Sequence, residues 1–303
     1  MANHRLVLAS GRGVGISAAG DPVSRRLVVF CHPTPGASGF DPNPPVTTDS
    51  GAHLLSLDRP GYGASDPLPE DVQPLVQDRA DDLAEILEKS EASAGRSGTD
   101  FGSIGVVGWS SGGAVALSLA ARHPHLVDRL AIVGTPAPSS AARAYDSQAL
   151  DLMIANIADR NDLAVQIAGR DPFTLRSLGV APDDPALALP GLDRRVERML
   201  ADAAIQGTIG IATDLIAARN TTWARELRRV AARTILVYGE SDLVAGRTDG
   251  QWFQRHVPHA RLVMVENAGH LAVASVWSRI MDHVAPLHGR GEPAGAREER
   301  AVT

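Results

Sequence analysis

The sequence predicts an α/β fold, a mostly parallel eight-stranded sheet flanked by helices, with an inserted helical cap. Eight short apolar runs have the length and composition of strands: residues 5–9, 14–18, 26–31, 53–57, 104–107, 126–133, 233–238 and 261–265. From residue 26 onward, helix-like runs separate most of these strands, and this alternation favours a parallel sheet. The alternation stops between residues 139 and 226, where Pro and Gly separate helix-like runs and no strand is indicated.

This interruption divides the chain into a sheet domain and a cap. We expect residues 1–138 and 227–287 to form the sheet domain and residues 139–226 to form the cap. The helix-like runs of the cap are residues 147–158, 163–168, 192–204 and 209–219. The segment 288–303 is rich in Gly, Arg and Glu and is predicted to be disordered. With 44% hydrophobic residues, a chain of 303 residues can bury a core for one large domain with an insertion.

The first two strands are predicted to form a hairpin, because a Gly-rich turn lies between them. The spacing of Gly11, Gly13 and Gly15 also resembles part of a nucleotide-binding loop. However, no helix and no phosphate-binding lysine follow these glycines, so we interpret them as a turn.

A rigid loop follows the strand at 26–31. Pro33 and Pro35 each fix a backbone angle φ, and Pro35 also favours an extended conformation at Thr34. A loop fixed in this way at the end of a buried strand can hold one backbone N–H in place. His32, at the start of the loop, is interpreted as a brace for it rather than a reacting group.

The strand at 53–57 leads into a second loop, which carries Asp58, Arg59 and Asp66. We interpret this charged turn as structural, with its charges paired with one another and with loop backbone.

Helices of the sheet domain are expected at 75–89, 114–122, 248–256 and 271–284, and the polar segment 90–100 is expected to be a connection.

A Gly-x-Ser-x-Gly motif at residues 108–112 joins the fifth strand to a helix. A strand that turns sharply into a helix needs small residues on both sides of the bend, and Gly108 and Gly112 supply them. Ser110 can then adopt a strained backbone conformation, and the Ser111 amide points from the start of a helix, where N–H groups favour negative charge. This arrangement suits a serine nucleophile and half of an oxyanion hole, although a Gly-rich turn can also be purely structural.

A serine nucleophile needs a base, and the base needs an orienting acid. In a parallel sheet, the loops after the carboxyl ends of the strands are suited to hold such groups. Two late loops carry them: residues 239–242 contain Glu240 and Asp242, and residues 266–270 end in His270.

Four motifs in this order resemble the α/β-hydrolase fold superfamily, and the resemblance covers residues 5–286. The motifs are DRPGYGASD at 58–66, GWSSG at 108–112, GESD at 239–242 and NAGH at 267–270. The resemblance implies Ser110 as the nucleophile, His270 as general base and then acid, and Asp242 as the orienting carboxylate. Glu240 is the rival acid, and the resemblance and the turn register favour Asp242.

The resemblance also implies the oxyanion hole, with the backbone N–H groups of Thr34 and Ser111 as its two donors. The chain departs from the family pattern at Pro33, where the family has Gly, but a proline removes only the donor at its own nitrogen. Trp109, beside the nucleophile, is expected either to pack under the site or to line one wall, and Trp109 and Pro35 are candidate pocket residues.

By this resemblance we expect a serine hydrolase that acts on an ester-like carbonyl through an acyl-enzyme. The carbonyl would belong to a carboxylic ester, thioester or lactone of a small to medium, fairly apolar substrate, selected by apolar cap residues. Neither cofactor nor metal is implied. The open alternatives are an acyltransferase, a hydrolase of carbon–carbon bonds, cofactor-free lyase or perhydrolase chemistry, and a ligand-binding or receptor-like homologue with little turnover.

The composition bounds the partners. A net charge of −6 argues against nucleic acid and anionic membranes, which leaves a small molecule as the expected partner and the oligomeric state open. No apolar run approaches the roughly 20 residues that span a bilayer, and no signal peptide is indicated, so we expect a cytoplasmic protein.

Cys31 is the single cysteine and cannot form an intramolecular disulfide. The pairs His123 with His125 and His256 with His259 are interpreted as helix-end and surface residues rather than metal ligands.

Overall fold

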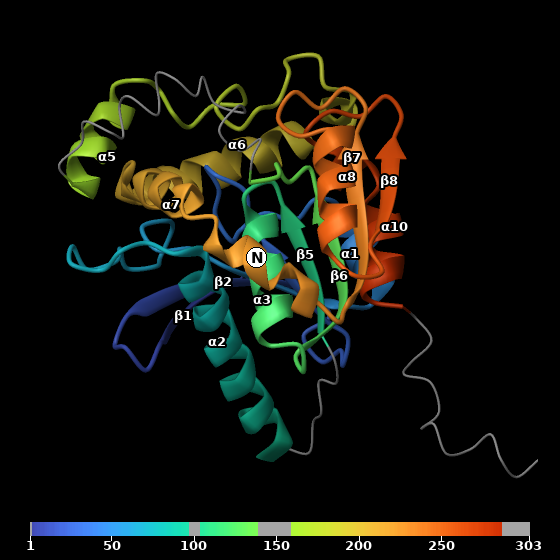
Figure 1. Ribbon diagram of the computed structural model, residues 1–303, viewed down its shortest axis with the longest axis horizontal. Coiled ribbons are helices and arrows are strands. Elements are labelled where there is room, and N and C mark those ends of the chain that lie inside the picture. Colours follow the sequence, from blue (N-terminus) through green and yellow to red (C-terminus); the bar gives the residue numbers. More distant parts are fainter. Residues whose placement is uncertain (1, 97–103, 139–158, 287–303) are drawn as a thin grey trace, which may run out of the picture.

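The computed structural model describes residues 2–96, 104–138 and 159–286. The helix expected at 147–158 and the terminal segment 288–303 therefore lie outside the described residues. Strands alternate with helices along most of the chain, and both faces of the sheet carry helices (Figure 1).

Eight strands form one sheet in the order β1-β2-β4-β3-β5-β6-β7-β8. Their bounds are β1 Ala2–Val7, β2 Gly13–Gly20, β3 Leu27–Cys31, β4 His53–Leu57, β5 Ile104–Trp109, β6 Val127–Val133, β7 Arg233–Gly239 and β8 Arg261–Val265. β1 and β2 form an antiparallel hairpin, β2 pairs antiparallel with β4, and all other pairs are parallel. The predicted eight-stranded, mostly parallel sheet and its N-terminal hairpin are confirmed.

Helices cover the sheet on both faces, so its central strands are apolar along their length. β3 and β5 are buried at every residue, as expected for strands between two layers of helices. On one face pack α2 Val76–Arg96, α3 Gly112–Arg122 and α8 Arg247–His256. On the other face pack α1 Pro44–Ser50, α9 Ala272–Ser275 and α10 Trp277–Val284.

Between β6 and β7 the chain leaves the sheet. Its described part, residues 160–229, is here called the inserted segment; it holds helices and, among the residues described, no strand. The helices are α5 Arg160–Ala168, η1 Pro185–Ala188, α6 Leu192–Ala203, η2 Ala204–Gln206, α7 Ile209–Arg219 and η3 Thr222–Arg229. In Figure 1, α6 lies beyond the end toward which the arrow of β5 points. The inserted segment therefore faces the carboxyl edge of the parallel strands, where ligand sites of such sheets occur.

The sequence interpretation was wrong at three places. Residues 90–96 continue helix α2 instead of forming a connection, because this polar stretch consists largely of good helix formers. The last helix is broken at Val276, whose φ of −119° and ψ of 28° are not helical, into α9 and α10. Helix α1 was not predicted; it begins with Pro44 and Pro45, whose fixed φ suits a first helical turn, and ends at Gly51 in the left-handed region.

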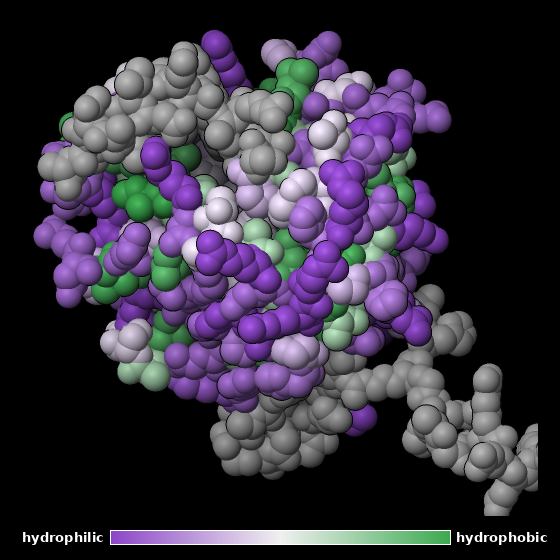
Figure 2. Space-filling view, viewed as in Figure 1, coloured by the Kyte–Doolittle hydropathy of each residue, from purple (hydrophilic) through white to green (hydrophobic). Residues whose placement is uncertain are grey.

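On the face in Figure 2, hydrophilic residues predominate and hydrophobic residues occur in small separate groups. Scattered apolar residues of this kind are ordinary on a protein surface.

No single helix of the described chain is long and apolar enough to cross a membrane. Residues 192–206 and 209–219 reach that length and apolarity only together, across a bend of 93°.

Gly105 gives a test of the packing of β5 against α10. A Cβ atom at this position would overlap the backbone carbonyl oxygen of Val284, which cannot rotate away as a flexible side chain can. We expect Gly105→Ala to lower the free energy of unfolding by about 1–3 kcal/mol, measured by urea denaturation.

Gly169 provides the matched control. It has φ −72°, and the nearest atom to an added Cβ, Gln166 O, lies 3.9 Å away, so Gly169→Ala is expected to change stability by less than about 0.5 kcal/mol. Equal stability of the two variants would contradict the packing described for β5.

Candidate active site

Ser110 occupies the turn between β5 and α3 with a φ of 53°, in the left-handed region. A non-glycine residue held there costs about 1–3 kcal/mol. Hydrogen bonds on both sides fix this conformation: the Ser110 N–H donates to Val133 O (2.8 Å), and the Ser110 carbonyl accepts from Gly113 N–H (3.0 Å) and the Thr135 hydroxyl (2.8 Å). The backbone conformation of this turn is therefore fixed by Val133 on β6 and by Thr135 in the loop after β6.

The glycines around Ser110 are required by close packing. A Cβ on Gly112 would overlap the backbone carbonyls of Cys31 and His32, and one on Gly113 would overlap the side chain of Thr135. The start of α3 therefore lies directly against the loop after β3 and the loop after β6. This packing brings Ser110 and Ser111 close to the loop that contains Thr34.

His270 and Asp242 form a buried pair. His270 Nδ1 lies 2.9 Å from Asp242 Oδ2 and 3.1 Å from Oδ1, and both side chains are fully buried. Asp242 Oδ1 also accepts hydrogen bonds from Val244 N–H (2.8 Å) and Ala245 N–H (3.2 Å), so the turn after β7 fixes the carboxylate. This carboxylate in turn fixes the orientation of the imidazole ring.

The pair also determines which nitrogen of His270 carries the proton. An ionised carboxylate only accepts hydrogen bonds, so Nδ1 donates and Nε2 of a neutral ring is left as the acceptor. Nε2 is buried and has no hydrogen-bond partner among the described residues. It is therefore free to take a proton from a group that approaches it.

Trp109 links the serine turn to the histidine loop. Its side chain is fully buried, its Nε1 donates to His270 O at 2.9 Å, and its ring centre lies 5.9 Å from that of His270. Phe40 packs on its other side at 5.4 Å. Trp109 is therefore packed between Phe40 and His270, and Pro35 is buried as well.

Gly134, directly after β6, makes room for the pair. Its φ is 53°, and a Cβ there would lie 3.0 Å from Asp242 Oδ2 and 3.3 Å from His270 Nδ1. Gly134 was not predicted as a site residue; a glycine directly after the apolar run at 126–133 is the sequence signal that could have found it.

Glu240, the rival acid, lies elsewhere. It is exposed and its carboxylate is 3.4 Å from Arg247 Nη2. Of the two carboxylates in this turn, the structure places Asp242 on His270.

Arg59, like Gly134, has a structural role at the site that was not predicted from the sequence. It donates through Nη2 to Pro33 O (2.8 Å) and to Thr34 Oγ1 (2.8 Å), and through Nη1 to His32 O. Its ion-pair partner is Asp214 on α7, at 2.6 Å. Arg59 therefore holds the loop after β3 rather than pairing with Asp58 or Asp66.

The other two charges of this turn bind loop backbone, as expected for structural residues. Asp58 accepts from Ser38 N–H (2.7 Å) and Ala64 N–H (3.0 Å). Asp66 accepts from Gly13 N–H (2.8 Å) and pairs with Arg5 at 2.7 Å. These contacts connect the turn after β4 to the hairpin and to the loop after β3.

The Arg59–Asp214 pair is buried, with 8% and 11% of the two side chains exposed. Burial by itself raises the pKa of Asp214, but the positive charge and hydrogen bonds of Arg59 bring it below its ordinary value. Thr34 Oγ1 (2.6 Å) and the Tyr62 hydroxyl (2.9 Å) also donate to this carboxylate. Asp214 is therefore ionised and fully hydrogen-bonded at neutral pH.

Asp184 makes a second contact between the inserted segment and the sheet domain. Its Oδ1 accepts from Ala186 N–H at 3.0 Å and its Oδ2 from Leu271 N–H at 3.3 Å. Leu271 follows His270, so the inserted segment touches the histidine loop as well as the loop with Thr34.

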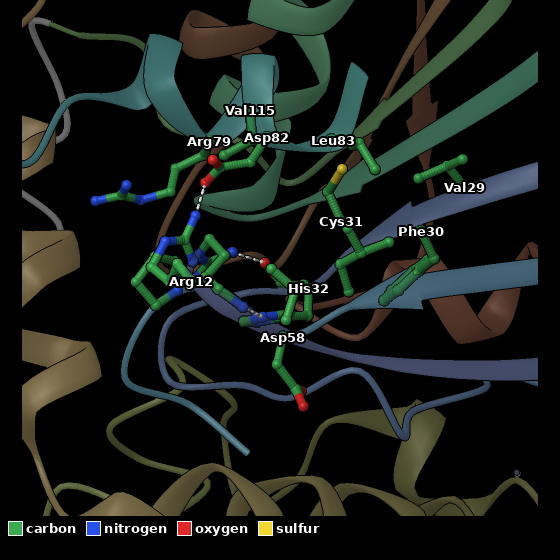
Figure 3. A pocket seen from close by; sticks show the side chains of 14 residues that line it. Arg12, Val29, Phe30, Cys31, His32, Asp58, Arg79, Asp82, Leu83 and Val115 are labelled. Atoms are coloured by element: carbon green, nitrogen blue, oxygen red, sulfur yellow. Dashed lines mark hydrogen bonds and ion pairs between the residues drawn. The ribbon is translucent and has the colours of Figure 1, made fainter. Parts of the chain in front are cut away.

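Figure 3 shows a cavity of about 40 Å³ between β3, the Arg59 turn and α2. Arg12 pairs with Asp82 there, while Arg79 has no hydrogen-bond partner among the described residues, and burial lowers its pKa to about 10. Ser110 and His270 are not among the lining residues. The cavity is therefore separate from the site formed by Ser110 and His270.

The strand order, the strained serine between β5 and α3, and the buried histidine–aspartate pair after β8 and β7 define an α/β hydrolase architecture. The sequence pattern that defines the alpha/beta hydrolase fold family matches residues 26–275, and the chain belongs to this family. The resemblance stated from the sequence is confirmed.

Curated relatives share one name. A pimeloyl-[acyl-carrier protein] methyl ester esterase from Neisseria meningitidis serogroup C is 33% identical over 170 residues, which cover 54% of this chain and 61% of the relative. A protein of the same name from Nitrosomonas europaea is 27% identical over 232 residues, covering 72% of this chain and 77% of the relative. The match thus spans less than two thirds of the length of the Neisseria protein.

The fold is also found among solved structures. A hydrolase from Pseudomonas aeruginosa superposes with a TM-score of 0.66 at 23% identity, covering 93% of this chain and 96% of the other. At this identity the likeness concerns the fold alone.

The environment of His32 predicts a pH dependence of stability. Burial, and then the positive charge of Arg59, lower the pKa of His32 from 6.5 to about 3. Between these values the unfolded chain binds more protons than the folded one, so the free energy of unfolding falls as the pH decreases. This single group contributes a slope of up to about 1.4 kcal/mol per pH unit.

We expect His32→Gln to be less stable than the wild type near neutral pH, because Nδ1 donates to Pro33 O (2.9 Å) and Nε2 accepts from Arg59 N–H (3.2 Å). The variant is also expected to lose less stability between about pH 7 and about pH 5, since it lacks the titrating group. Urea unfolding at both pH values measures the difference, and equal slopes for the two proteins would refute it.

Proposed function

We propose that this protein is an ester hydrolase that uses Ser110 as nucleophile, His270 as general base and acid, and Asp242 as the orienting acid. The observation that carries the proposal is the buried His270–Asp242 pair, which leaves Nε2 as an unoccupied acceptor. The backbone of His270 is hydrogen-bonded to Trp109, the residue directly before the strained Ser110. The relatives named as methyl ester esterases support the reaction type.

In the proposed course, Ser110 Oγ attacks the ester carbonyl carbon while its proton passes to His270 Nε2. The resulting oxyanion is stabilised by the N–H groups of Thr34 and Ser111. The tetrahedral intermediate collapses to an acyl-enzyme, and the departing alkoxide takes the proton from His270. Water, deprotonated by the same nitrogen, then releases the acid. Asp242 stays ionised and stabilises the imidazolium in both halves of the reaction.

The substrate proposed is a carboxylic ester with a small alcohol and a fairly apolar acyl chain. The names of the relatives specify a methyl ester on an acyl chain joined to a carrier protein, and this is the finer form of the proposal. The inserted segment, acting as a cap, would enclose the acyl chain, since Asp214 and Asp184 contact the loops that carry Thr34 and His270.

The first test combines covalent labelling with turnover. Purified protein is treated with a fluorophosphonate probe, followed by intact-mass analysis and peptide mapping, beside a panel of p-nitrophenyl esters of increasing chain length. We expect labelling at Ser110 and ester turnover, and Ser110→Ala should lower kcat by about 10⁶-fold.

Ser118→Ala is the matched control, because Ser118 is buried on α3 and its hydroxyl has no partner among the described residues. This variant is expected to label and turn over as the wild type does. Labelling without turnover would favour a transferase or a receptor-like protein, and absence of labelling would overturn the role of Ser110.

The assignment of the acid is tested separately. Asp242→Asn keeps the shape but stabilises the wrong tautomer of His270, so we expect kcat to fall by about 10⁴-fold. Glu240→Gln, two residues away in the same turn, is expected to leave kcat within about twofold, because Glu240 is exposed and its carboxylate pairs with Arg247. Steady-state kinetics with p-nitrophenyl butyrate measures both; a larger loss in Glu240→Gln would reverse the assignment.

A further inference from the structure

Asp214 on α7 makes hydrogen bonds to three side chains of the sheet domain. Its carboxylate accepts from Arg59 Nη2 (2.6 Å), from Thr34 Oγ1 (2.6 Å) and from the Tyr62 hydroxyl (2.9 Å). Arg59 Nε also lies 3.2 Å from both carboxylate oxygens, so the guanidinium binds in a forked geometry. The contact is therefore directional as well as charged.

Arg59 transmits this contact to the backbone next to Thr34. Its Nη2 donates to Pro33 O at 2.8 Å. The carbonyl of Pro33 and the N–H of Thr34 belong to one planar peptide group, in which they point in opposite directions. A hydrogen bond that fixes the Pro33 carbonyl therefore also fixes the direction of the Thr34 N–H.

Thr34 transmits the contact to Ser111. The hydroxyl oxygens of Thr34 and Ser111 are 2.8 Å apart. Because the Thr34 hydroxyl donates its one proton to Asp214, the Ser111 hydroxyl is the donor in this bond. Both residues with a proposed oxyanion donor are thus joined to each other and, through Thr34, to Asp214.

We propose that Asp214 is a positioning residue: through Arg59 and Thr34 it orients the two oxyanion donors, so that the hole is complete only when α7 is seated on the sheet domain. The inference rests on the proposed ester hydrolysis. The donors are needed most at the tetrahedral transition state, so loss of Asp214 acts on kcat rather than on KM.

Asp214→Asn tests this role, since it retains the size of the side chain and removes its charge. With p-nitrophenyl butyrate we expect kcat to fall by about 10- to 100-fold, with KM changed by less than about threefold. The affinity for butylboronic acid, whose tetrahedral adduct uses the same two donors, is expected to fall by a factor similar to that in kcat/KM.

Asp41→Asn is the matched control. Asp41 is a buried carboxylate that accepts from the Thr47 hydroxyl (2.8 Å) and Asn43 N–H (3.0 Å), away from Thr34 and Arg59. The same isosteric change there is expected to leave kcat and boronate affinity within about twofold of the wild type.

Thr34→Val gives a second, independent variant, which keeps the backbone N–H and removes the hydroxyl between Asp214 and Ser111. We expect it to show the same loss in kcat, and it carries the test if Asp214→Asn does not fold by circular dichroism. Because both side chains act in one chain of contacts, the double variant is expected to lose little more than the worse single variant.

The outcomes separate this inference from the proposed function. An active wild type with an unchanged kcat in folded Asp214→Asn, or a loss confined to KM, overturns the positioning role alone. Fully multiplicative effects of the two substitutions also overturn it. A wild type without ester turnover overturns the proposed function, and this inference with it.

Discussion

The buried ion pair between Arg59 and Asp214 constrains the arrangement around the candidate site. Removing two charges from water costs several kcal/mol per ion unless good geometry and further hydrogen bonds compensate. Here Asp214 accepts from three side chains, and Arg59 donates to the carbonyls of His32 and Pro33 as well as to the carboxylate. Neither charge can be displaced without leaving the other unpaired. The inserted segment is therefore held on the sheet domain in one register by polar contacts, in addition to apolar packing.

That register matters because the inserted segment touches both halves of the candidate site. Asp214 reaches the loop with Thr34, and Asp184 reaches the backbone directly after His270. The strained turn of Ser110 is held by hydrogen bonds to Val133 on β6 and from Thr135 in the loop after it. The loops after six neighbouring strands, β4, β3, β5, β6, β7 and β8, are thus fixed relative to one another. Such preorganisation is what the proposed stabilisation of a developing charge requires.

Much of the fold and part of the site could be predicted because their signals are local. Apolar runs, the glycines around Ser110 and the chain order of the motifs indicated the eight strands, the turn and the histidine–aspartate loops. The errors occurred where local signals mislead: prolines usually break helices but begin α1, and the polar residues 90–96 extend α2. The choice of Asp242 over Glu240 needed the family resemblance. Both carboxylates lie in the same turn, two residues apart, and no other sequence feature distinguishes them.

The Arg59–Asp214 pair could not be predicted, because its two residues are 155 positions apart and no local pattern connects them. Arg59 has Asp58 beside it and Asp66 in the same turn, so pairing within the turn was the simpler interpretation. Asp214 did carry a usable signal: it is the one acidic residue in a helix, Ile209–Arg219, that is otherwise mainly apolar. A carboxylate at such a position is stable only with a buried partner. The sequence could therefore have indicated that a cationic side chain pairs with Asp214. Which cation it is depends on how the inserted segment packs on the sheet, and only the folded structure contains that information.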